Sequence, residues 1–412
     1  MAKRHLIGIG GVGMSALATA LVKLGDTVTG ADRTLGTPNV RFLESLGVKV
    51  FPDDGSGVDA TTDEVVVSTA IEETNAGLRK ARELGIPVTH RAKALARTLR
   101  DYKLVAVVGT CGKSTVTAML GHVLAECGLD PMCVNGANVS GWEGAVRFGK
   151  GEYAVAEVDE SDKSLVAFKP YAALVTNASA DHYSKEEMDE VFDAFVRDVP
   201  GPIVDGRRDA DMLDGDETEE LKRVQPLPGK HNLQNAMLAV AMAKALGIEG
   251  GKAIAALASF RGVERRLQRI DRPGDKPFAV YDDYAHNPEK IHAMWTTLAD
   301  KHPQGICVIW RPHGYGPLRK MKDALATMLR ATVRPQDKLL LLPVYDAGGT
   351  AERDVNSGDL AALLGVGQAQ LVGDHGEALD WCAAHRSAFG AFVTCGAREP
   401  QLPDLARRLG AM

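Results

Sequence analysis

Several features that mark other protein classes are missing from this sequence. No apolar run reaches the ~18 residues that a membrane-spanning helix needs, and MAKRH leads into strand-like LIGIG with no cleavable signal pattern. The six cysteines form no CxxC pair and no disulfide-framework spacing, so we expect reduced thiols in a cytoplasmic protein. The formal net charge of −6 gives no basic surface for nucleic acid. We therefore expect neither a membrane nor a nucleic acid among the partners.

Aromatic residues are also scarce, at 5% of the 412 residues, so the cores must be built from Ala, Val and Leu. What the chain does contain is a repeated alternation of short β-rich runs and longer amphipathic segments. The strand-like runs are KRHLIGIG, DTVTGAD, DEVVVSTA, KLVAVVG, YAVAEV, AALVTN, FAVYDDY, GICVIW, KLLLLPVY and AFVTCG. This alternation predicts an α/β protein with largely parallel sheets, divided into domains at 1–100, 101–270 and 271–412.

The first strand-like run ends in a glycine loop. Gly8, Gly10 and Gly13 form the pattern G-x-G-x-x-G between a strand and a helix. Such glycines permit a tight turn, let the backbone approach a diphosphate and let the helix pack closely on the strand. Asp32 ends the next strand, where an acid often bonds a ribose hydroxyl. A turn without a ligand is the plainer alternative, but the combined pattern favours a diphosphate ligand.

A second glycine loop lies about a hundred residues later, in VAVVGTCGKSTVTAML. The usual spacing would place glycine at Val107, so this is the shorter form G-x-x-G-K-S. Backbone amides surround the phosphates, Lys113 adds a positive charge, and the Ser114 or Thr115 hydroxyl can reach Mg²⁺. The strand and helix on either side predict a nucleoside triphosphate site. Two phosphate loops in different domains argue against a dehydrogenase and favour a chain that brings a nucleotide-linked substrate to ATP.

Acidic and imidazole side chains follow two further strands. YAVAEVDESD places Glu157, Asp159, Glu160 and Asp162 after one strand, and AALVTNASADHYS places Asn177, Asp181 and His182 after another. A solvated loop is the plain interpretation of an acidic cluster. Repeated placement at strand ends near a phosphate loop favours Mg²⁺ instead, since it is a hard cation that keeps phosphate oxygens and waters.

A set of short motifs extends along nearly the whole chain, in the order GIGGVGMSALA, VVVSTAIEETN, HRAKALA, GTCGKST, AEVDESD, TNASADH, GKHNLQNA, FRGVERR, YDDYAHNPEKI, RPHGY and LPVYDAGG. In these motifs the chain resembles the Mur ligase family. Each is weak by itself, but their joint order is specific. Within the family, the opening loop and the DDYAHNP block are most similar to the member that adds the first amino acid, usually L-alanine, to UDP-N-acetylmuramate.

The resemblance implies three domains and an activity. The domains would be a Rossmann-like N-terminal domain for the UDP-sugar, a shortened central P-loop ATPase-type domain, and a C-terminal Rossmann-like domain for the amino acid. ATP would phosphorylate the substrate carboxylate to an acyl phosphate, and the amino acid would then attack it to form an amide. The implied partners are UDP-N-acetylmuramate and an amino acid, the implied cofactors are ATP and Mg²⁺, and the chain is expected to be a monomer or a homodimer.

The resemblance also implies roles for residues at matching motif positions. Lys113, Glu157, His182, Arg266 and His286 are the implied catalytic residues, and Ser114, Glu157 and His182 the implied metal ligands. The ATP site would comprise Gly109, Thr110, Gly112, Lys113, Ser114, Thr115, His231, Asn232, Asn235 and Asp282. Substrate-binding residues would be Gly10, Gly11, Val12, Gly13, Asp32, Ser68, Arg91, Tyr284, His286, His313 and Arg319, with His90 nearby.

Three departures from the family pattern stand out. The phosphate loop has Cys111 and Ser114 where the family has His and Thr; Ser keeps the hydroxyl, and we interpret Cys111 as a packing residue. The segment between FDAFVRDV and PGKHNLQN is short, polar and charged. PHGYGP replaces PHRYTR, so both arginines that would hold the incoming carboxylate are lost. Arg311 or Arg319 could replace them, because a carboxylate needs a fork of donors; solvated surface charge is the alternative.

Three other functions stay open at this point. A ligase that recycles a murein tripeptide onto the same UDP-sugar has a different opening loop. A non-catalytic homologue that binds UDP-sugar is suggested by the lost arginines and the shortened central domain, although Lys113 and Ser114 are retained. An NAD-dependent oxidoreductase is disfavoured by the GKS loop.

Overall fold

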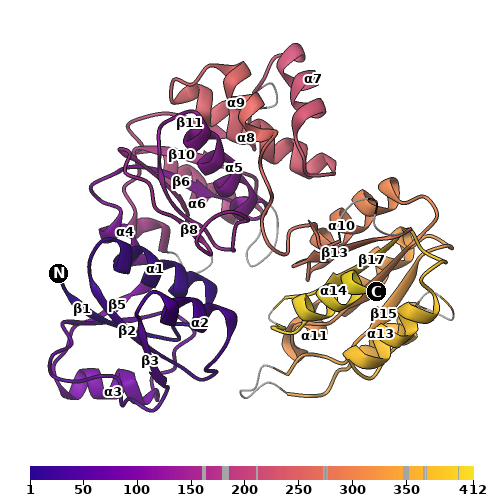
Figure 1. Ribbon diagram of the computed structural model, residues 1–412, viewed down its shortest axis with the longest axis horizontal. Coiled ribbons are helices and arrows are strands. Elements are labelled where there is room, and N and C mark those ends of the chain that lie inside the picture. Colours follow the sequence, from indigo (N-terminus) through magenta and orange to yellow (C-terminus); the bar gives the residue numbers. More distant parts are fainter. Residues whose placement is uncertain are drawn as a thin grey trace. The chain divides into compact units, whose positions relative to one another are not determined.

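The computed structural model describes residues 1–159, 164–178, 185–209, 212–271, 274, 277–346, 352–364, 367, 369–397 and 399–412. It is a three-domain α/β fold built on three mostly parallel sheets (Figure 1). The chain divides into two compact units. The first comprises Met1–Pro226 and Asn232–Val263, and the second comprises Leu227–His231 and Glu264–Met412. In the part of the chain described here, no helix is long and apolar enough to cross a membrane.

The first sheet has five parallel strands in the order β3-β2-β1-β4-β5. Its elements are β1 (Lys3–Ile7), α1 (Val12–Lys23), β2 (Thr27–Asp32), α2 (Pro38–Ser45), β3 (Lys49–Pro52), β4 (Glu64–Val67), α3 (Ala76–Glu83), β5 (Val88–His90) and α4 (Arg91–Thr98). Helices begin where the sequence caps them: Thr37 accepts the Val40 N–H and is followed by Pro38. The strand order reverses between β1 and β4, which is where ligands bind in open α/β sheets.

The central sheet belongs to the same unit and has the order β11-β10-β6-β9-β7-β8, with only the β7–β8 pair antiparallel. Its elements are β6 (Lys103–Val108), α5 (Lys113–Glu126), β7 (Met132–Val134), β8 (Val146–Arg147), β9 (Tyr153–Glu157), the 3₁₀ helix η1 (Ser164–Ala167), β10 (Ala172–Val175), α6 (Lys185–Val196), β11 (Ile203–Asp205), α7 (Gly215–Val224), α8 (Lys230–Ala245) and α9 (Gly250–Leu257). One continuous hydrophobic cluster joins Leu17 of α1, Leu95 of α4 and Met132 of β7. The first two sheets therefore share a buried core.

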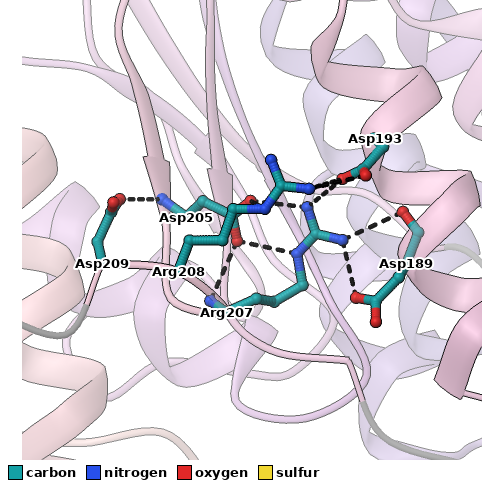
Figure 2. Close-up of polar contacts among 6 residues, drawn as sticks. All are labelled: Asp189, Asp193, Asp205, Arg207, Arg208 and Asp209. Carbon is teal, nitrogen blue, oxygen red and sulfur yellow. Dashed lines mark hydrogen bonds and ion pairs between the residues drawn. The ribbon is translucent and has the colours of Figure 1, made fainter.

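The short, charged segment of the central domain forms the edge strand β11 and an arginine network (Figure 2). Arg207 donates to Asp205 in β11 (Nη2–Oδ2 2.6 Å) and to Asp189 (2.9 Å) and Asp193 (2.7 Å) in α6. Its side chain is 7% exposed, whereas the neighbouring Arg208, which also pairs with Asp193, is 61% exposed. Arg207 thus fastens the last strand of the sheet to the helix beside it.

The third sheet, in the second unit, has the order β12-β13-β17-β14-β15-β16, with only β12 antiparallel. Its elements are β12 (Gln268–Arg269), β13 (Ala279–Asp283), α10 (Pro288–Lys301), β14 (Ile306–Trp310), α11 (Tyr315–Thr332), β15 (Lys338–Leu341), α12 (Ser357–Leu364), β16 (Ala369–Leu371), α13 (His375–Ala384), β17 (Ala391–Cys395) and α14 (Leu402–Ala411). Helices α10, α11 and α12 pack with one face of this sheet, and α13 and α14 with the other.

Candidate functional site

The phosphate loop connects β6, at the centre of its sheet, to α5. Gly109 and Gly112 have φ angles of +132° and +82°, a backbone region that favours glycine. Lys113 Nζ donates to the Gly109 carbonyl at 2.6 Å, so the ammonium lies over the loop. Ser114 and Thr115 open α5 and are buried, as is Thr110 before them. Because α5 has no side-chain N-cap, the helix N-terminus presents amide donors of the kind that bind phosphate.

Two residues that follow β10 hold this loop in shape. Asn177 pairs with both backbone groups of Cys111: its Oδ1 accepts the N–H at 2.9 Å and its Nδ2 donates to the carbonyl at 3.0 Å. Thr176 donates to the same carbonyl at 2.6 Å. A Cβ atom on Gly109 would lie 2.1 Å from Thr176 Oγ1, so only glycine fits there. The Cys111 side chain is half-buried and free of any disulfide.

Helix α8 brings an amide side chain to the same loop. A Cβ atom on Gly112 would lie 2.5 Å from Asn235 Oδ1, which shows how closely Asn235 approaches it. Asn235 Nδ2 donates to Asn232 Oδ1 at 3.4 Å, and both asparagines are buried. His231, the third residue of this motif, falls in the stretch that groups with the second unit, and burial lowers its pKa.

Two of the predicted metal ligands, Glu157 and Ser114, lie in the described part of the central domain. Glu157 ends β9, which pairs with β6 in parallel, and its Oε2 accepts the Gly136 N–H at 2.8 Å. Ser114 supplies a buried hydroxyl. His182, Glu160, Asp162 and Asp181 lie outside the described residues. Within the described part of the chain, no three His, Cys, Asp or Glu side chains group as a metal site. A hydroxyl and a carboxylate nevertheless suit Mg²⁺, which takes few protein oxygens and keeps water and phosphate ligands.

The first glycine loop lies at the strand-order reversal of its own sheet, between β1 and α1. Asp32 accepts the Gly10 N–H at 2.8 Å through Oδ2 and the Thr34 N–H at 2.9 Å through Oδ1. Asn39 donates to the Gly10 carbonyl at 2.9 Å. Asp32, the residue predicted to face a ribose, therefore holds the loop itself in place.

The remaining predicted residues of the first domain surround the start of α1. Gly11 caps this helix without a side-chain bond, and the Val12 side chain is 38% exposed. The atoms nearest to a Cβ placed on Gly13 belong to the Arg91 guanidinium, with Nη1 at 3.1 Å. Gly13 therefore makes room for a cation rather than for close packing on the strand, which corrects our interpretation of that glycine. Ser68 lies just after β4, across the reversal point from the loop.

Two buried aspartates end β13 in the third domain. Asp282 is fully buried between Arg265 Nε (3.1 Å) and Thr394 Oγ1 (2.6 Å). Asp283 accepts the backbone N–H groups of Leu267 (2.6 Å) and Ala285 (2.7 Å), and burial raises its pKa to about 6. Arg265 and Leu267 both have positive φ, at +58° and +47°. The two carboxyl groups therefore fix an unusual turn, at the tip of which lies Arg266.

An aromatic and imidazole cluster lies next to this turn. The Arg266 guanidinium lies 5.3 Å from the ring centre of Tyr284, and Tyr284 packs edge-on against His286 at 5.6 Å. His286 packs in turn against the nearly buried His313, 4.9 Å away. Burial lowers the pKa of His286 to about 3, so its ring is neutral near pH 7. The structure thus brings Arg266, Tyr284, His286 and His313 together.

Arg319 lies apart from any such cluster of buried groups. Its side chain is 42% exposed, and its Nε donates to Asp354 at 3.0 Å. Asn177, which the sequence placed after a strand near the phosphate loop, braces that loop. Several other contributors were not identified from the sequence: Thr176, Asn39, and Arg265 with Asp283. Thr176 comes directly after β10 in the motif TNASADH, and that position is the signal that could have revealed it. Asn39 lies in the first turn of α2, where no sequence pattern marks it.

Fold and site together define a class: multidomain α/β enzymes that carry a triphosphate loop in one parallel-sheet domain and a dinucleotide-type loop in another. The sequence model of the family described as "Mur ligase family, catalytic domain" matches residues 3–103. The family model described as "Mur ligase, glutamate ligase domain" matches residues 265–398. UDP-N-acetylmuramate–L-alanine ligase of Solidesulfovibrio magneticus is 34% identical over 391 residues, covering 84% of this chain and 83% of that protein.

Solved structures agree. The crystal structure of UDP-N-acetylmuramate–alanine ligase from Thermotoga maritima superimposes with a TM-score of 0.81 at 25% identity, covering 99% of this chain and 98% of that one. A murein peptide ligase from Psychrobacter arcticus shares the fold, with a TM-score of 0.67 at 21% identity over 100% of this chain and 99% of that one. The chain belongs to the Mur ligase family, and it is a ligase.

Proposed function

We propose that this protein is an ATP-dependent ligase that joins L-alanine to the carboxylate of UDP-N-acetylmuramate in peptidoglycan precursor synthesis. The observation that carries the proposal is the braced phosphate loop, with Lys113 over it and Asn235 against it. The relatives named for this reaction, which align along most of their length, support the choice of substrate.

The chemistry proceeds through an acyl phosphate. A carboxylate is a poor acyl donor until one oxygen becomes a leaving group, so a carboxylate oxygen of the sugar first takes the γ-phosphoryl group of ATP and ADP is released. The amine of alanine then attacks the carbonyl carbon and loses a proton, a C–N bond forms, and the C–O bond to phosphate breaks. Phosphoryl transfer depends mostly on positioning and charge neutralisation.

Separate groups of residues serve the separate parts of this reaction. Lys113 and the amide groups of the loop neutralise the phosphates, while Asn235 contacts the nucleotide. Ser114 and Glu157, together with His182, would hold Mg²⁺, which supplies further positive charge on the phosphate oxygens when bound. The loop from Gly8 to Gly13, with Arg91 beside it, would hold the diphosphate of the UDP-sugar. The neutral His286 adds no positive charge that would repel the incoming ammonium group.

The proposal is tested by measuring phosphate release with ATP, UDP-N-acetylmuramate and a panel of all common L- and D-amino acids. We expect release that requires both the UDP-sugar and an amino acid, and L-alanine should give the highest kcat/KM. No dependence on any amino acid would refute the ligase. A preference for the murein tripeptide over L-alanine in direct competition would instead assign the recycling reaction.

A further inference from the structure

The proposed reaction leaves one chemical requirement without a residue. The incoming amino acid carries a carboxylate that must be held while its amine reacts, and the sequence has Gly314 and Pro317 where the resemblance implies arginines. A carboxylate in a partly buried site needs charge-assisted donors, best supplied by a guanidinium. Two arginines near this position, Arg311 and Arg319, are candidates.

Arg319 is already engaged at the surface. Its guanidinium donates to the Asp354 carboxylate through Nε at 3.0 Å, and to the Glu352 carbonyl at 3.1 Å. Both of these partners are exposed, as is Arg319 itself. Water and salt screen such a pair, so this arginine is poorly suited to orient a substrate.

Arg311 lies at the carboxyl end of a strand of the third sheet, at a position where ligands commonly bind in such sheets. It directly follows β14, and Glu399 lies in the loop after β17, the strand that pairs with β14. Helix α11, which comes after β14, packs on one face of the sheet, and α14, which comes after β17, packs on the other. When the connections that follow two neighbouring strands run to opposite faces of a parallel sheet, a crevice opens at the carboxyl ends of these strands. Ligands commonly bind in such a crevice.

The surroundings of Arg311 hold its guanidinium in one orientation. Its Nη1 forms an ion pair with Glu399, whose side chain is only 3% exposed, and its Cζ lies 5.5 Å from the ring centre of Tyr345. Its Nε is buried and has no hydrogen-bond partner among the residues that the structure describes. Since Glu399 pairs with Nη1, the edge of the guanidinium that carries Nε remains for a second hydrogen-bond acceptor. A buried donor without a partner is costly, which points to a ligand.

We propose that Arg311, oriented by Glu399 and Tyr345, binds the carboxylate of the incoming amino acid through the Nε edge of its guanidinium. The inference rests on the proposed ligase function, since it names how that site recognises its second substrate. One guanidinium held in a fixed orientation would thus bind the carboxylate in place of the two arginines that the sequence lacks.

The test compares Arg311→Gln with the native enzyme on L-alanine and on L-alaninamide, which lacks the carboxylate. We expect the KM for L-alanine to rise about 10- to 100-fold, the loss typical of a hydrogen bond to a charged group. The KM for L-alaninamide, ATP and UDP-N-acetylmuramate should stay within about twofold. Arg319→Gln tests the other candidate arginine and should not show this selective rise. Arg330→Gln, at an exposed position on α11, is the matched control and should leave every KM unchanged.

Several results would overturn the inference. One is an unchanged KM for L-alanine in Arg311→Gln; others are an equal rise for the amide, or a rise in Arg319→Gln instead. Should the single variant not fold because Glu399 is left unpaired, the double variant Arg311→Gln/Glu399→Gln keeps a neutral hydrogen-bonding pair and must show the same selective rise. If the native enzyme accepts another amino acid, that substrate and its amide are used. A native enzyme inactive with every amino acid refutes the proposed function, whereas an active one that tolerates Arg311→Gln refutes this inference alone.

Discussion

His5 shows what burial does to a single ionisable side chain. It lies in β1 with 1% of its surface exposed, and its Nδ1 is 2.9 Å from Thr29 Oγ1. Burial, and next the charge of Lys3, lower the pKa of His5 from 6.5 to about 4; Asp59 and Asp53 oppose this. Between pH 6.5 and 4 the unfolded chain therefore binds a proton that the folded protein does not.

That difference predicts an acid sensitivity. As the pH falls from 6.5 to 4, the His5 contribution should lower the free energy of unfolding by up to about 3 kcal/mol, and then level off. Urea unfolding at a series of pH values, compared with His5→Gln, measures it. The variant should lose less stability across this window, and parallel curves for the two proteins would contradict the prediction.

Single residues are also where the sequence was least informative. The motifs place Asp32 at a strand end correctly, but they do not reveal that one of its oxygens accepts the Gly10 N–H of the glycine loop and the other the Thr34 N–H. Arg311 and Glu399 are 88 positions apart in the sequence, counted from their numbers. Their pairing depends on β17 inserting beside β14, and that strand order cannot be read from local patterns.

At the scale of elements, the Arg207 network links β11 to α6. Removing the guanidinium takes away the nearest cation of the 8% exposed Asp205 carboxylate and leaves, among the described residues, only the Arg207 backbone N–H at 3.1 Å and the Arg208 Nε at 3.8 Å. Such a loss is costly for a buried charge. Arg207→Gln should lower the free energy of unfolding by about 3 kcal/mol. Arg208→Gln, on the exposed neighbour, should lower it by less than about 1 kcal/mol.

Chemical denaturation of the two variants under the same conditions measures this difference. Equal losses would mean that the network acts as ordinary surface charge. Equal stability of Arg207→Gln and the native protein would show that β11 is held by its backbone pairing with β10 alone.

The longer strands were largely predictable from the sequence. Every strand-like run noted in the sequence forms a strand. Runs such as LVAVV and ICVIW are apolar throughout and buried on both faces of a parallel sheet, which makes them easy to recognise. Among the strands that were missed, β8, β11 and β12 are two or three residues long and carry polar side chains. Their pairing is imposed by the neighbouring strand, so the local sequence holds little signal.

For the whole molecule, the two glycine loops predict that ATP and the UDP-sugar bind at separate sites, so that a change in one loop should affect the binding of one ligand only. Lys113→Ala should abolish ADP formation, with at least a roughly 10³-fold loss of kcat, because nothing else on the loop supplies a mobile positive charge. Calorimetry should show that the affinity for UDP-N-acetylmuramate changes by less than about threefold. An equal loss of UDP-sugar affinity would mean that one site, not two, holds both phosphorylated ligands.

The hydrophobic cluster shared by α1, α4 and the central sheet has a consequence for dissecting the protein. Leu17 and Leu95 are buried together with Met132 in one core, so a fragment cut near residue 100 would expose apolar surface that the intact chain hides. The first hundred residues are thus not an independent module to be transplanted or expressed alone. If the first domain binds the UDP-sugar and the central domain binds ATP, as we propose, both sites depend on this one core, and we expect unfolding of either domain to abolish both.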